Sequence, residues 1–406
     1  MKEQKINRRK FVASLGIAGA VATLHPFSVF SKPLPKPDDA AIGVMKCKPY
    51  LQASYSDKIT VRWITNLNCY SWVEYGEGTA NLNLKAHNVV DGLVQANNTI
   101  NDITLHNLLP GKTYYYQVVS KKINQFNAGK VSYAETYKSE VYSFTTPAKI
   151  IDKVEFLVFN DVHDRPETFA QLMKYQDAGK KDFVLLNGDI FSSLKGGENQ
   201  VVEHLLNPVG DLFGTHTPLI YSRGNHEARG EYARQLPGYF NGRENKFYYS
   251  FQYGPMCAIV LDTGEDKEDA APPYGGIVEF EPYRMAQKKW LEQEVQKEAF
   301  RKAKYKIVFC HIPPHYTANK DAHGTIACRE IFGPVLNKAN IDLMICGHTH
   351  RYKVRPAVAG IHNYAIVIGG GPEDGDRTVI SVKADYKKLD LKITDDSGKI
   401  VGTFNL

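Results

Sequence analysis

The sequence predicts an α/β domain with a layered β core flanked by helices, preceded by an all-β sandwich domain. Between residues 45 and 147, segments such as KITVRWIT and TYYYQVVS alternate apolar and polar residues, with Gly, Asn and Pro turns between them. From residue 152 onward, continuous apolar runs such as VEFLVF and KIVFC alternate with amphipathic stretches. Such runs are typical of strands buried on both faces, so we expect layered sheets and helices there.

Residues 1–36 have the layout of an export signal followed by a linker. Basic residues that include Arg8 and Arg9 precede the apolar stretch FVASLGIAGAVATLHPFSVF, and KPLPKPDD follows it. The NRRKFV start resembles a twin-arginine signal, so we expect the export machinery as a partner and a periplasmic or extracellular location in a bacterium. A membrane anchor is the alternative, because the apolar stretch approaches the ~20 residues that span a bilayer. His25, Pro26 and the many small residues favour a signal over a stable span.

The charge of the chain gives no indication of nucleic-acid binding. The 406 residues carry 50 Lys and Arg against 44 Asp and Glu, which is a net charge of +6 at pH 7. Much of this excess precedes Phe11, and the rest of the chain is nearly neutral. Because a nucleic-acid-binding domain usually concentrates basic residues on one face, we expect no nucleic-acid partner.

The six cysteines show no CxxC pair and no zinc-finger spacing. Cys257, Cys310 and Cys346 lie in apolar runs, where Cys usually behaves as a small hydrophobic residue. Cys47 and Cys69 could form a disulfide in an oxidising compartment, and the sequence leaves that question open.

The segment from 45 to 147 resembles a fibronectin type III-like sandwich. In LLPGKTYYYQV a turn leads into a strand and places Tyr114 like the corner tyrosine of that fold. The segment closes with YSFTTPA, which is typical of a last strand followed by a proline exit. Another small β-sandwich is the alternative, and under either interpretation we expect a scaffold rather than a catalytic domain.

Residues 152–406 form the predicted α/β domain with closing C-terminal strands. Its predicted strands are VEFLVF, DFVLLN, PLIYSR, CAIVLD, KIVFCH and IDLMIC. PETFAQLMKYQDAGK and YRMAQKKWLEQEVQKEAF have the periodicity of amphipathic helices. After about residue 360, NYAIVIGGG, TVISVKAD and KLDLKITD predict the closing strands.

Polar side chains follow five of these six strands. They are Asp161 and His163 after the first strand, Asp189 after the second, Asn225 and His226 after the third, His311 after the fifth, and His348 and His350 after the sixth. Functional sites in open α/β sheets gather at the carboxyl ends of strands. Carboxylate, imidazole and amide groups are ligands for divalent metals, so the pattern predicts a metal site. Each ending alone could be an ordinary turn or helix cap, but the complete set is difficult to explain in that way.

The ordered set D-x-H, G-D, G-N-H-E, a single His and G-H-x-H resembles the calcineurin-like metallophosphoesterases over about residues 152–375. The resemblance implies a two-metal site with seven ligands, and it gives His226 a catalytic role beside the substrate. In that scheme Asp161, His163 and His350 hold one ion, Asn225, His311 and His348 hold the other, and Asp189 bridges both.

Three glycines stand in these motifs, namely Gly188, Gly224 and Gly347. Glycine allows backbone conformations that other residues avoid. We therefore expect each of them to turn the chain sharply beside a ligand.

The reaction implied by the resemblance is the hydrolysis of a phosphoric ester by a metal-bridging hydroxide. A metal-held water ionises near neutral pH and would attack phosphorus in line. The metals and His226 would offset charge on the phosphoryl oxygens. An ordinary imidazole titrates at about 6.5, so His226 could also protonate the leaving oxygen. No Ser or Cys nucleophile is needed.

The order of the domains is similar to that of purple acid phosphatases, and QASYSDKITVRWIT reads much like their N-terminal domain. Two positions differ: His163 stands where those enzymes have Gly, and Ser192 stands where they have a Tyr ligand to ferric iron. We therefore expect two divalent ions, such as Mn, Fe, Zn or Co, and no purple chromophore. The G-D-x-x-D-R-G motif of protein Ser/Thr phosphatases is also absent, which gives no support to a phosphoprotein substrate.

The favoured function is that of an exported, metal-dependent phosphomonoesterase acting on small organic phosphates. The alternative is a phosphodiesterase acting on nucleotides or lipid headgroups, since loops such as residues 264–282 could choose the substrate. A third possibility is a non-catalytic surface-binding protein, against which the complete ligand set and His226 count. Arg165, Arg223 and Arg351 lie beside motifs and could contact phosphate or form surface ion pairs.

Overall fold

The computed structural model describes residues 43–52, 56–177, 179–240, 246–316 and 322–406. The expected export signal and linker, residues 1–36, lie outside the described residues. Residues Asp39–Leu406 form one compact unit. None of the helices in the described part of the chain has the length and apolar character that crossing a bilayer requires.

The N-terminal part consists of β-strands, as its alternating pattern predicts. The strands are β1 (Tyr50–Gln52), β2 (Ile59–Gly76), β3 (Leu84–Ala86), β4 (Val89–Val90), β5 (Leu93–Val94), β6 (Ala96–Leu105), β7 (Thr113–Asn127), β8 (Lys130–Lys138) and β9 (Tyr142–Thr145). The long strand β2 pairs antiparallel with both β6 and β7. Trp63 is fully buried beneath them, and its Nε1 donates a hydrogen bond of 2.9 Å to Ser120 Oγ. The Tyr114 hydroxyl accepts a hydrogen bond of 2.9 Å from the backbone N–H of Leu109, which is the contact expected of a corner tyrosine.

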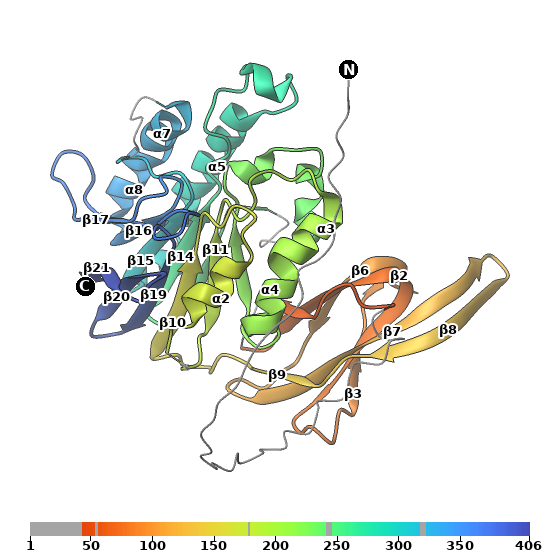
Figure 1. The fold of residues 1–406 in the computed structure, drawn as a ribbon. Coiled ribbons are helices and arrows are strands. Elements are labelled where there is room, and N and C mark those ends of the chain that lie inside the picture. Colours follow the sequence, from red (N-terminus) through yellow and green to blue (C-terminus); the bar gives the residue numbers. More distant parts are fainter. Residues whose placement is uncertain (1–42, 53–55, 178, 241–245, 317–321) are drawn as a thin grey trace, which may run out of the picture. The chain divides into compact units, whose positions relative to one another are not determined.

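The C-terminal part is built on two sheets (Figure 1). Its strands are β10 (Lys153–Phe159), β11 (Phe183–Asn187), β12 (Leu219–Ser222), β13 (Tyr249–Tyr253), β14 (Met256–Leu261), β15 (Tyr305–Cys310), β16 (Leu343–Cys346), β17 (Lys353–Arg355), β18 (Ala365–Ile368), β19 (Thr378–Asp385), β20 (Leu389–Asp395) and β21 (Ile400–Asn405). The first sheet contains the order β21-β20-β19-β10-β11-β12, and the second has the order β13-β14-β15-β16-β18-β17. All six predicted apolar runs and the three closing segments form strands.

Alternate residues of β10 face two different hydrophobic cores. Phe156 and Val158 lie in a core with Phe309 of the second sheet, so this core fills the space between the sheets. Leu157 and Phe159 lie in another core, on the side of the first sheet that helices cover. Successive side chains of a strand point to opposite faces, and here both faces are buried. This explains why the run VEFLVF is almost continuously apolar.

Helices pack on the outer faces of the two sheets (Figure 1). They are α2 (Glu167–Met173), α3 (Gly197–Val201) and α4 (Asn207–Val209) for the first sheet, and α5 (Phe280–Glu294), α6 (Glu298–Lys302), α7 (His323–Ala327) and α8 (Gly333–Ala339) for the second. π-Helical turns follow α3, α4 and α7; they are η1 (Val202–Leu206), η2 (Gly210–Gly214) and η7 (Cys328–Phe332). The sequence had indicated α2 and α5 but not the run from α3 to η2. The signal was present there, because Val201, Leu205 and Val209 recur at helical spacing and are buried.

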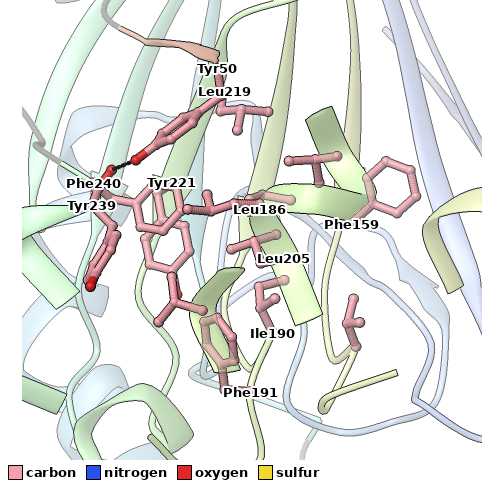
Figure 2. Close-up of a cluster of buried hydrophobic side chains, with 14 of the residues drawn as sticks. Tyr50, Phe159, Leu186, Ile190, Phe191, Leu205, Leu219, Tyr221, Tyr239 and Phe240 are labelled. Carbon is pink, nitrogen blue, oxygen red and sulfur yellow. Dashed lines mark hydrogen bonds between the residues drawn. The ribbon is translucent and has the colours of Figure 1, made fainter. Parts of the chain in front are cut away.

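Strand β1 links the N-terminal strands to the first sheet. It pairs in parallel with β12 and antiparallel with β2, so the N-terminal strands extend this sheet. Tyr50 of β1 lies in the same hydrophobic cluster as Phe159 and Leu186 (Figure 2). Its hydroxyl donates a hydrogen bond of 3.0 Å to the backbone carbonyl of Tyr239. The sequence predicts two separate folds and not this continuity, because pairing between distant strands leaves no local pattern.

All six cysteines are buried free thiols in this structure. Cys47 and Cys69, whose pairing the sequence leaves open, are therefore not bridged here. Cys310 and Cys346 lie at the ends of the neighbouring strands β15 and β16, with their sulfur atoms 3.5 Å apart.

Candidate metal centre

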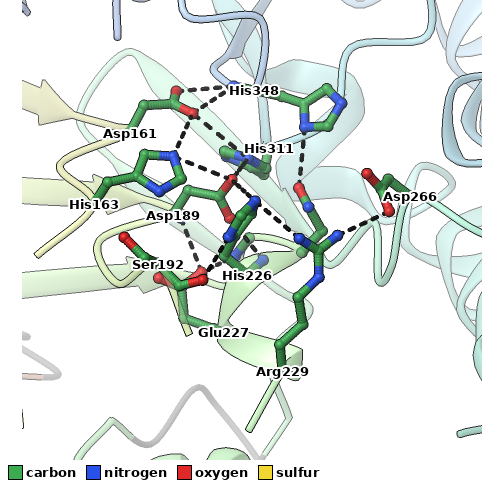
Figure 3. Close-up of polar contacts among 12 residues, drawn as sticks. Asp161, His163, Asp189, Ser192, His226, Glu227, Arg229, Asp266, His311 and His348 are labelled. Atoms are coloured by element: carbon green, nitrogen blue, oxygen red, sulfur yellow. Dashed lines mark hydrogen bonds and ion pairs between the residues drawn. The ribbon is translucent and has the colours of Figure 1, made fainter. Parts of the chain in front are cut away.

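The predicted ligands come from the carboxyl ends of strands in both sheets. Asp161, Asp189 and Asn225 follow β10, β11 and β12, which are parallel neighbours in the first sheet. His311 and His348 follow β15 and β16, which are parallel neighbours in the second sheet. Neighbouring parallel strands end at the same edge of a sheet, which brings these side chains together. Figure 3 shows the side chains of Asp161, Asp189 and His311 pointing toward one another.

Asp161, His163 and His350 form one compact group of possible metal ligands. His350 Nε2 lies 3.0 Å from His163 Nε2 and 3.3 Å from Asp161 Oδ1. His163 Nε2 lies 3.8 Å from the same oxygen of Asp161. Two nitrogens bound at about 2.1 Å to one cation, at a right angle, would lie about 3 Å apart. The separation between the two imidazoles is therefore compatible with two ligands of one ion.

Asp189, His311 and His348 form a second group, and Asn225 lies beside it. His311 Nε2 is 2.9 Å from Asp189 Oδ2, and His348 Nδ1 is 3.0 Å from Asn225 Oδ1. Asp189 Oδ2 also lies 3.8 Å from His163 Nε2 and so faces the first group. The structure thus brings all seven predicted ligands into two adjoining groups, with Asp189 between them, and a third overlapping group joins His163 and Asp189 to His226.

His311 provides a direct test of whether a cation fits this place. Its side chain is fully buried, and its Nδ1 lies 2.9 Å from the backbone carbonyl oxygen of Asn187. A carbonyl can only accept, so Nδ1 carries a proton, and Nε2 is the ring nitrogen left for a cation or a second proton. That nitrogen faces Asp189 and has no hydrogen-bond partner among the described residues. A lone pair opposite a carboxylate needs a cation or a proton between them, and this mixed N and O donor set suits first-row divalent metals.

The charges of the buried groups lead to the same conclusion. Burial opposes a charged Asp189, but His311 lowers its pKa to about 2. Burial also opposes a charged His311, but Asp189 and Asp161 raise its pKa to about 10. Burial again opposes ionisation of Asp161, but His311 and His163 hold its pKa well below the ordinary value. The two carboxylates, Asp161 and Asp189, therefore require positive charge beside them. Either a bound divalent cation or a proton on His311 can supply it.

Five of the seven predicted ligands adopt left-handed backbone conformations. Their φ angles are 51° for Asp161, 50° for His163, 51° for Asp189, 71° for His348 and 55° for His350. Residues other than Gly rarely adopt such angles, and each costs on the order of 1 kcal/mol or more. Strain of this kind is typical of functional sites. Here it occurs where the chain turns away from the ends of β10, β11 and β16.

The glycines of the motifs serve the site in two different ways. Gly188 has a φ of 83° and turns the chain sharply, as expected. The same expectation was wrong for Gly224 and Gly347, which do not have positive φ angles. A Cβ at Gly224 would instead overlap the carboxylate of Asp189, and a Cβ at Gly347 would overlap that of Asp161. Glycine is needed at these two positions because a ligand side chain packs directly against the backbone.

Glu227, which the sequence did not indicate as a site residue, holds the turns that carry the ligands. It is fully buried, and its two oxygens accept four backbone hydrogen bonds. The donors are the N–H groups of Asp189 (2.9 Å) and Gly224 (2.8 Å) to Oε2, and of Ile190 (2.6 Å) and Phe191 (3.1 Å) to Oε1. Burial and the nearby Asp189 raise the pKa of Glu227 to about 7. The motif G-N-H-E places Glu227 beside two predicted site residues, but only the folded structure shows that its carboxylate accepts hydrogen bonds from backbone N–H groups.

His226 lies at the edge of the cluster and is held at both ring nitrogens. Its Nδ1 donates to the backbone carbonyl of Ser192 at 2.7 Å, and its Nε2 lies 3.0 Å from Arg229 Nη1. Its backbone N–H donates to Asp189 Oδ1 at 2.9 Å, while its Nε2 lies 3.9 Å from Asp189 Oδ2. The ring packs edge-on against that of His163, with centroids 4.8 Å apart. The side chain is 27% exposed, so it is accessible to a small molecule beside the cluster.

The arginines that the sequence indicated are not the ones that contact the cluster. Arg223 Nη2 lies 2.6 Å from Asp262 Oδ2, and Arg165 Nη2 lies 2.7 Å from Glu373 Oε1. Arg351 is exposed. Arg229, three residues after His226, contacts that histidine directly.

Comparisons with known proteins agree with this arrangement. Residues 154–352 match the calcineurin-like phosphoesterase family, and residues 47–146 match the purple acid phosphatase N-terminal domain. A probable purple acid phosphatase of Arabidopsis thaliana is 24% identical over 325 residues, which cover 73% of this chain and 66% of that protein. Purple acid phosphatase 1 of Ipomoea batatas is 24% identical over 241 residues, which cover 54% of this chain and 47% of that protein. The chain therefore spans about two thirds or less of the length of these curated relatives.

Two solved structures have a similar fold. A purple acid phosphatase from yellow lupin seeds (Lupinus luteus) has a TM-score of 0.65 and 17% identity, over 88% of this chain and 73% of that one. The structure of PhoD has a TM-score of 0.64 and 12% identity, over 91% of this chain and 90% of that one. At such identities the likeness concerns the fold alone. The matched families show that residues 154–352 are a calcineurin-like phosphoesterase domain and that residues 47–146 ahead of it are a purple acid phosphatase N-terminal domain.

Proposed function

We propose that this chain is a metal-dependent phosphomonoesterase acting on small organic phosphates. The observation that carries the proposal is the convergence of seven ligand-type side chains in two adjoining groups on either side of Asp189. The family match supports hydrolysis of phosphoric esters. The curated relatives are named as phosphatases, which favours monoesters.

Two divalent cations are the cofactors in this proposal. Asp161, His163 and His350 hold one of them, Asn225, His311 and His348 hold the other, and Asp189 lies between the two. When bound, such a pair of cations would polarise the phosphoryl oxygens and lower the pKa of a water molecule enough for it to attack phosphorus near neutral pH.

His226 is the catalytic residue in this proposal, because its ring borders the cluster and is accessible. An imidazole there can donate a hydrogen bond to a phosphoryl oxygen or a proton to the leaving oxygen. Its backbone N–H fixes one oxygen of Asp189, so the other oxygen faces the cluster. The bridging carboxylate and the catalytic imidazole are thus positioned by the same turn.

We expect the bound metals to be Mn, Fe, Zn or Co in the divalent state. Ser192 occupies the position at which purple acid phosphatases have their Tyr ligand, and a serine cannot supply a phenolate. Its backbone instead serves the site, since its N–H donates to Asp164 Oδ2 at 2.8 Å and its carbonyl accepts from His226. The loaded protein should therefore show no purple absorption band.

We also infer that the protein acts outside the cytoplasm, after passage through the export machinery. The support for this inference is the pattern of residues 1–36, with its pair Arg8 and Arg9 ahead of a mild apolar stretch.

The test is the hydrolysis of p-nitrophenyl phosphate and bis-p-nitrophenyl phosphate by the purified chain. We expect faster turnover of the monoester, and a loss of more than about 100-fold in Asp189→Asn. The exposed Asp152→Asn is the matched control and should keep full activity. Faster turnover of the diester would instead identify a phosphodiesterase, and metal binding without either activity would favour the non-catalytic binding protein.

A further inference from the structure

Arg229 connects the catalytic histidine to a long loop that lies between β14 and α5. It directly follows η3 (His226–Ala228), the short 3-10 turn that carries His226. Its Nη1 contacts His226 Nε2 at 3.0 Å, and Figure 3 shows its side chain between His226 and Asp266 of the loop. Its Nε contacts Glu265, which also belongs to the loop. No sequence pattern indicates this connection, because residues 229 and 265 are far apart along the chain.

The contact with Arg229 defines the state of the His226 ring. A guanidinium has only donors, so His226 Nε2 must accept this hydrogen bond with its lone pair. The carbonyl of Ser192 has only lone pairs, so His226 Nδ1 must carry the proton. In this arrangement the ring is held at both nitrogens and no rotation keeps both partners, so His226 can serve a substrate only after it gives up one of these two contacts. Removal of Arg229 would leave the ring held at Nδ1 alone.

Two carboxylates of the loop fix Arg229 in turn. Arg229 Nε lies 2.7 Å from Glu265 Oε1, and Nη2 lies 2.9 Å from Glu265 Oε2, which is the two-pronged geometry that orients a guanidinium. Nη2 also lies 2.9 Å from Asp266 Oδ1. Glu265 is buried, so its charge depends on this partner. Burial opposes a charged Arg229, but Glu265 raises its pKa above the ordinary value.

The loop itself is anchored at several points and is therefore able to hold Arg229 in place. The backbone carbonyl of Asp266 accepts a hydrogen bond of 3.0 Å from the N–H of Gly324, at α7. Asp269 accepts from the N–H groups of Phe280 (2.8 Å) and Glu281 (3.0 Å), which lie in the first turn of α5. These bonds satisfy backbone donors at the helix start and tie the loop to the second sheet's helices.

We propose that Arg229 is a positioning residue that couples the 264–279 loop to His226 and sets the orientation of the catalytic imidazole before a substrate binds. The inference rests on the proposed function for its effect on turnover, but the contact itself can be tested without any substrate. It assigns a role to the loop as well, because Glu265 and Asp266 determine where the guanidinium lies.

Arg229→Lys is the test variant, because it keeps a positive charge for Glu265 and cannot reach His226 at the same time. Arg234→Lys is the matched control, since exposed Arg234 donates to the carbonyl of Ile277 in the same loop. We expect kcat for p-nitrophenyl phosphate to fall about tenfold or more in Arg229→Lys, with little change in KM. The reason is that a misplaced His226 would lose part of its contribution as a general acid. Metal content and Tm should stay near wild type in both variants, and Arg234→Lys should keep its kcat.

A double-mutant cycle shows whether Arg229 acts through His226. If it does, Arg229→Lys causes no further loss of kcat in a His226→Gln background. An equal loss in both backgrounds would overturn the proposal, because Arg229 would then act on its own. A second variant replaces both partners, Arg229→Gln together with Glu265→Gln, so that no unpaired charge is left buried. Its loss of kcat should likewise disappear in a His226→Gln background.

The contact can also be followed by NMR through the 15N signals of the His226 ring. The sample is the Zn²⁺-loaded full chain at pH 8, and the His226 signals are assigned as those that disappear in His226→Gln. We expect one set of ring 15N signals, the same in the wild type and in Arg234→Lys, and a shifted or mixed set in Arg229→Lys. An unchanged signal in Arg229→Lys would overturn the proposal. Failure of the wild type to hydrolyse any phosphate ester would refute the proposed function, while this spectrum would still decide the role of Arg229.

Discussion

Single residues hold the ligands of this site through their hydrogen bonds to backbone. Glu227 is the clearest case, because four N–H groups from two separate turns converge on one buried carboxylate. Its neighbours Asn225 and His226 belong to the proposed catalytic apparatus, whereas Glu227 only fixes the backbone that carries them. Such a residue is difficult to predict from sequence, since an acidic residue in a turn is usually solvated.

Glu227→Gln should therefore destabilise the fold as well as the site. An amide NH₂ cannot accept hydrogen bonds, so two of the four backbone donors would face another donor in a buried place. We expect a loss of about 2–4 kcal/mol in the free energy of unfolding, measured by urea denaturation. Glu292→Gln, at an exposed position of α5, is the control and should change stability by less than about 0.5 kcal/mol. Equal effects of the two changes would show that the backbone donors do not depend on Glu227.

A surface ion pair supplies a prediction for pH. Asp177 contacts Lys181 and Lys383, with Asp177 Oδ2 at 2.7 Å from Lys383 Nζ, and these partners lower its pKa to about 2. Because the folded-state pKa is depressed, the ion pair contributes stability above the ordinary carboxyl pKa, and this contribution is lost as the pH falls through about 2. Asp177 is half-exposed, so Asp177→Asn should cost less than about 1 kcal/mol at pH 7.

The measurement is the urea midpoint of the wild type and of Asp177→Asn at pH 7 and at pH 2.5. The difference between the two proteins should shrink at the lower pH. A difference that is the same at both values would show that the ion pair does not cause it.

At the scale of elements, five strands deliver one or two polar groups to the site at the point where each of them ends, namely β10, β11, β12, β15 and β16. This rule could be predicted from sequence, because a buried strand, a Gly and a polar residue are adjacent along the chain. The backbone is strained after three of these strands, β10, β11 and β16, with φ of 51° at Asp161 and at Asp189 and 71° at His348. What the sequence could not provide is the packing of one turn against another, such as Gly224 against Asp189.

Gly224→Ala tests that packing. The added methyl group would overlap the carboxylate and the backbone N of Asp189, so either the turn or the Asp189 side chain must move. We expect a loss of stability of about 1–3 kcal/mol or more, together with weaker metal binding. Gly129→Ala is the control, because a Cβ there has nothing within 4 Å and would be tolerated. Full metal content in Gly224→Ala would contradict this interpretation, and metal analysis of the two purified variants decides it.

At the scale of the whole molecule, the layered architecture could be predicted because it depends on local patterns. The run VEFLVF indicated burial on both faces, and β10 is indeed covered on both. The features that could not be predicted all join distant segments: β1 with β12, and Arg229 with Glu265. A contact of that kind depends on how the finished layers are stacked, and a single sequence carries no periodic signal for it.

The inferred export of the molecule leads to a separate prediction. If Arg8 and Arg9 are read by the twin-arginine machinery, replacing both with Lys should retain the protein in the cytoplasm. Fractionation of cells that express the full chain, followed by detection of the protein in the periplasm, provides the measurement. An unchanged distribution of the double variant would refute this route.

The most direct test of the central claim is the amount of metal bound to the purified chain, measured for the wild type and for Asp189→Asn. The two adjoining ligand groups predict about two divalent ions per wild-type chain, and a clear loss of bound metal when the shared carboxylate is replaced by an amide. Removal of the metal from the wild type with a chelator should lower Tm, and adding it back should restore Tm. A wild-type chain that binds no metal, or an Asp189→Asn variant that keeps two ions with unchanged affinity, would contradict the claim.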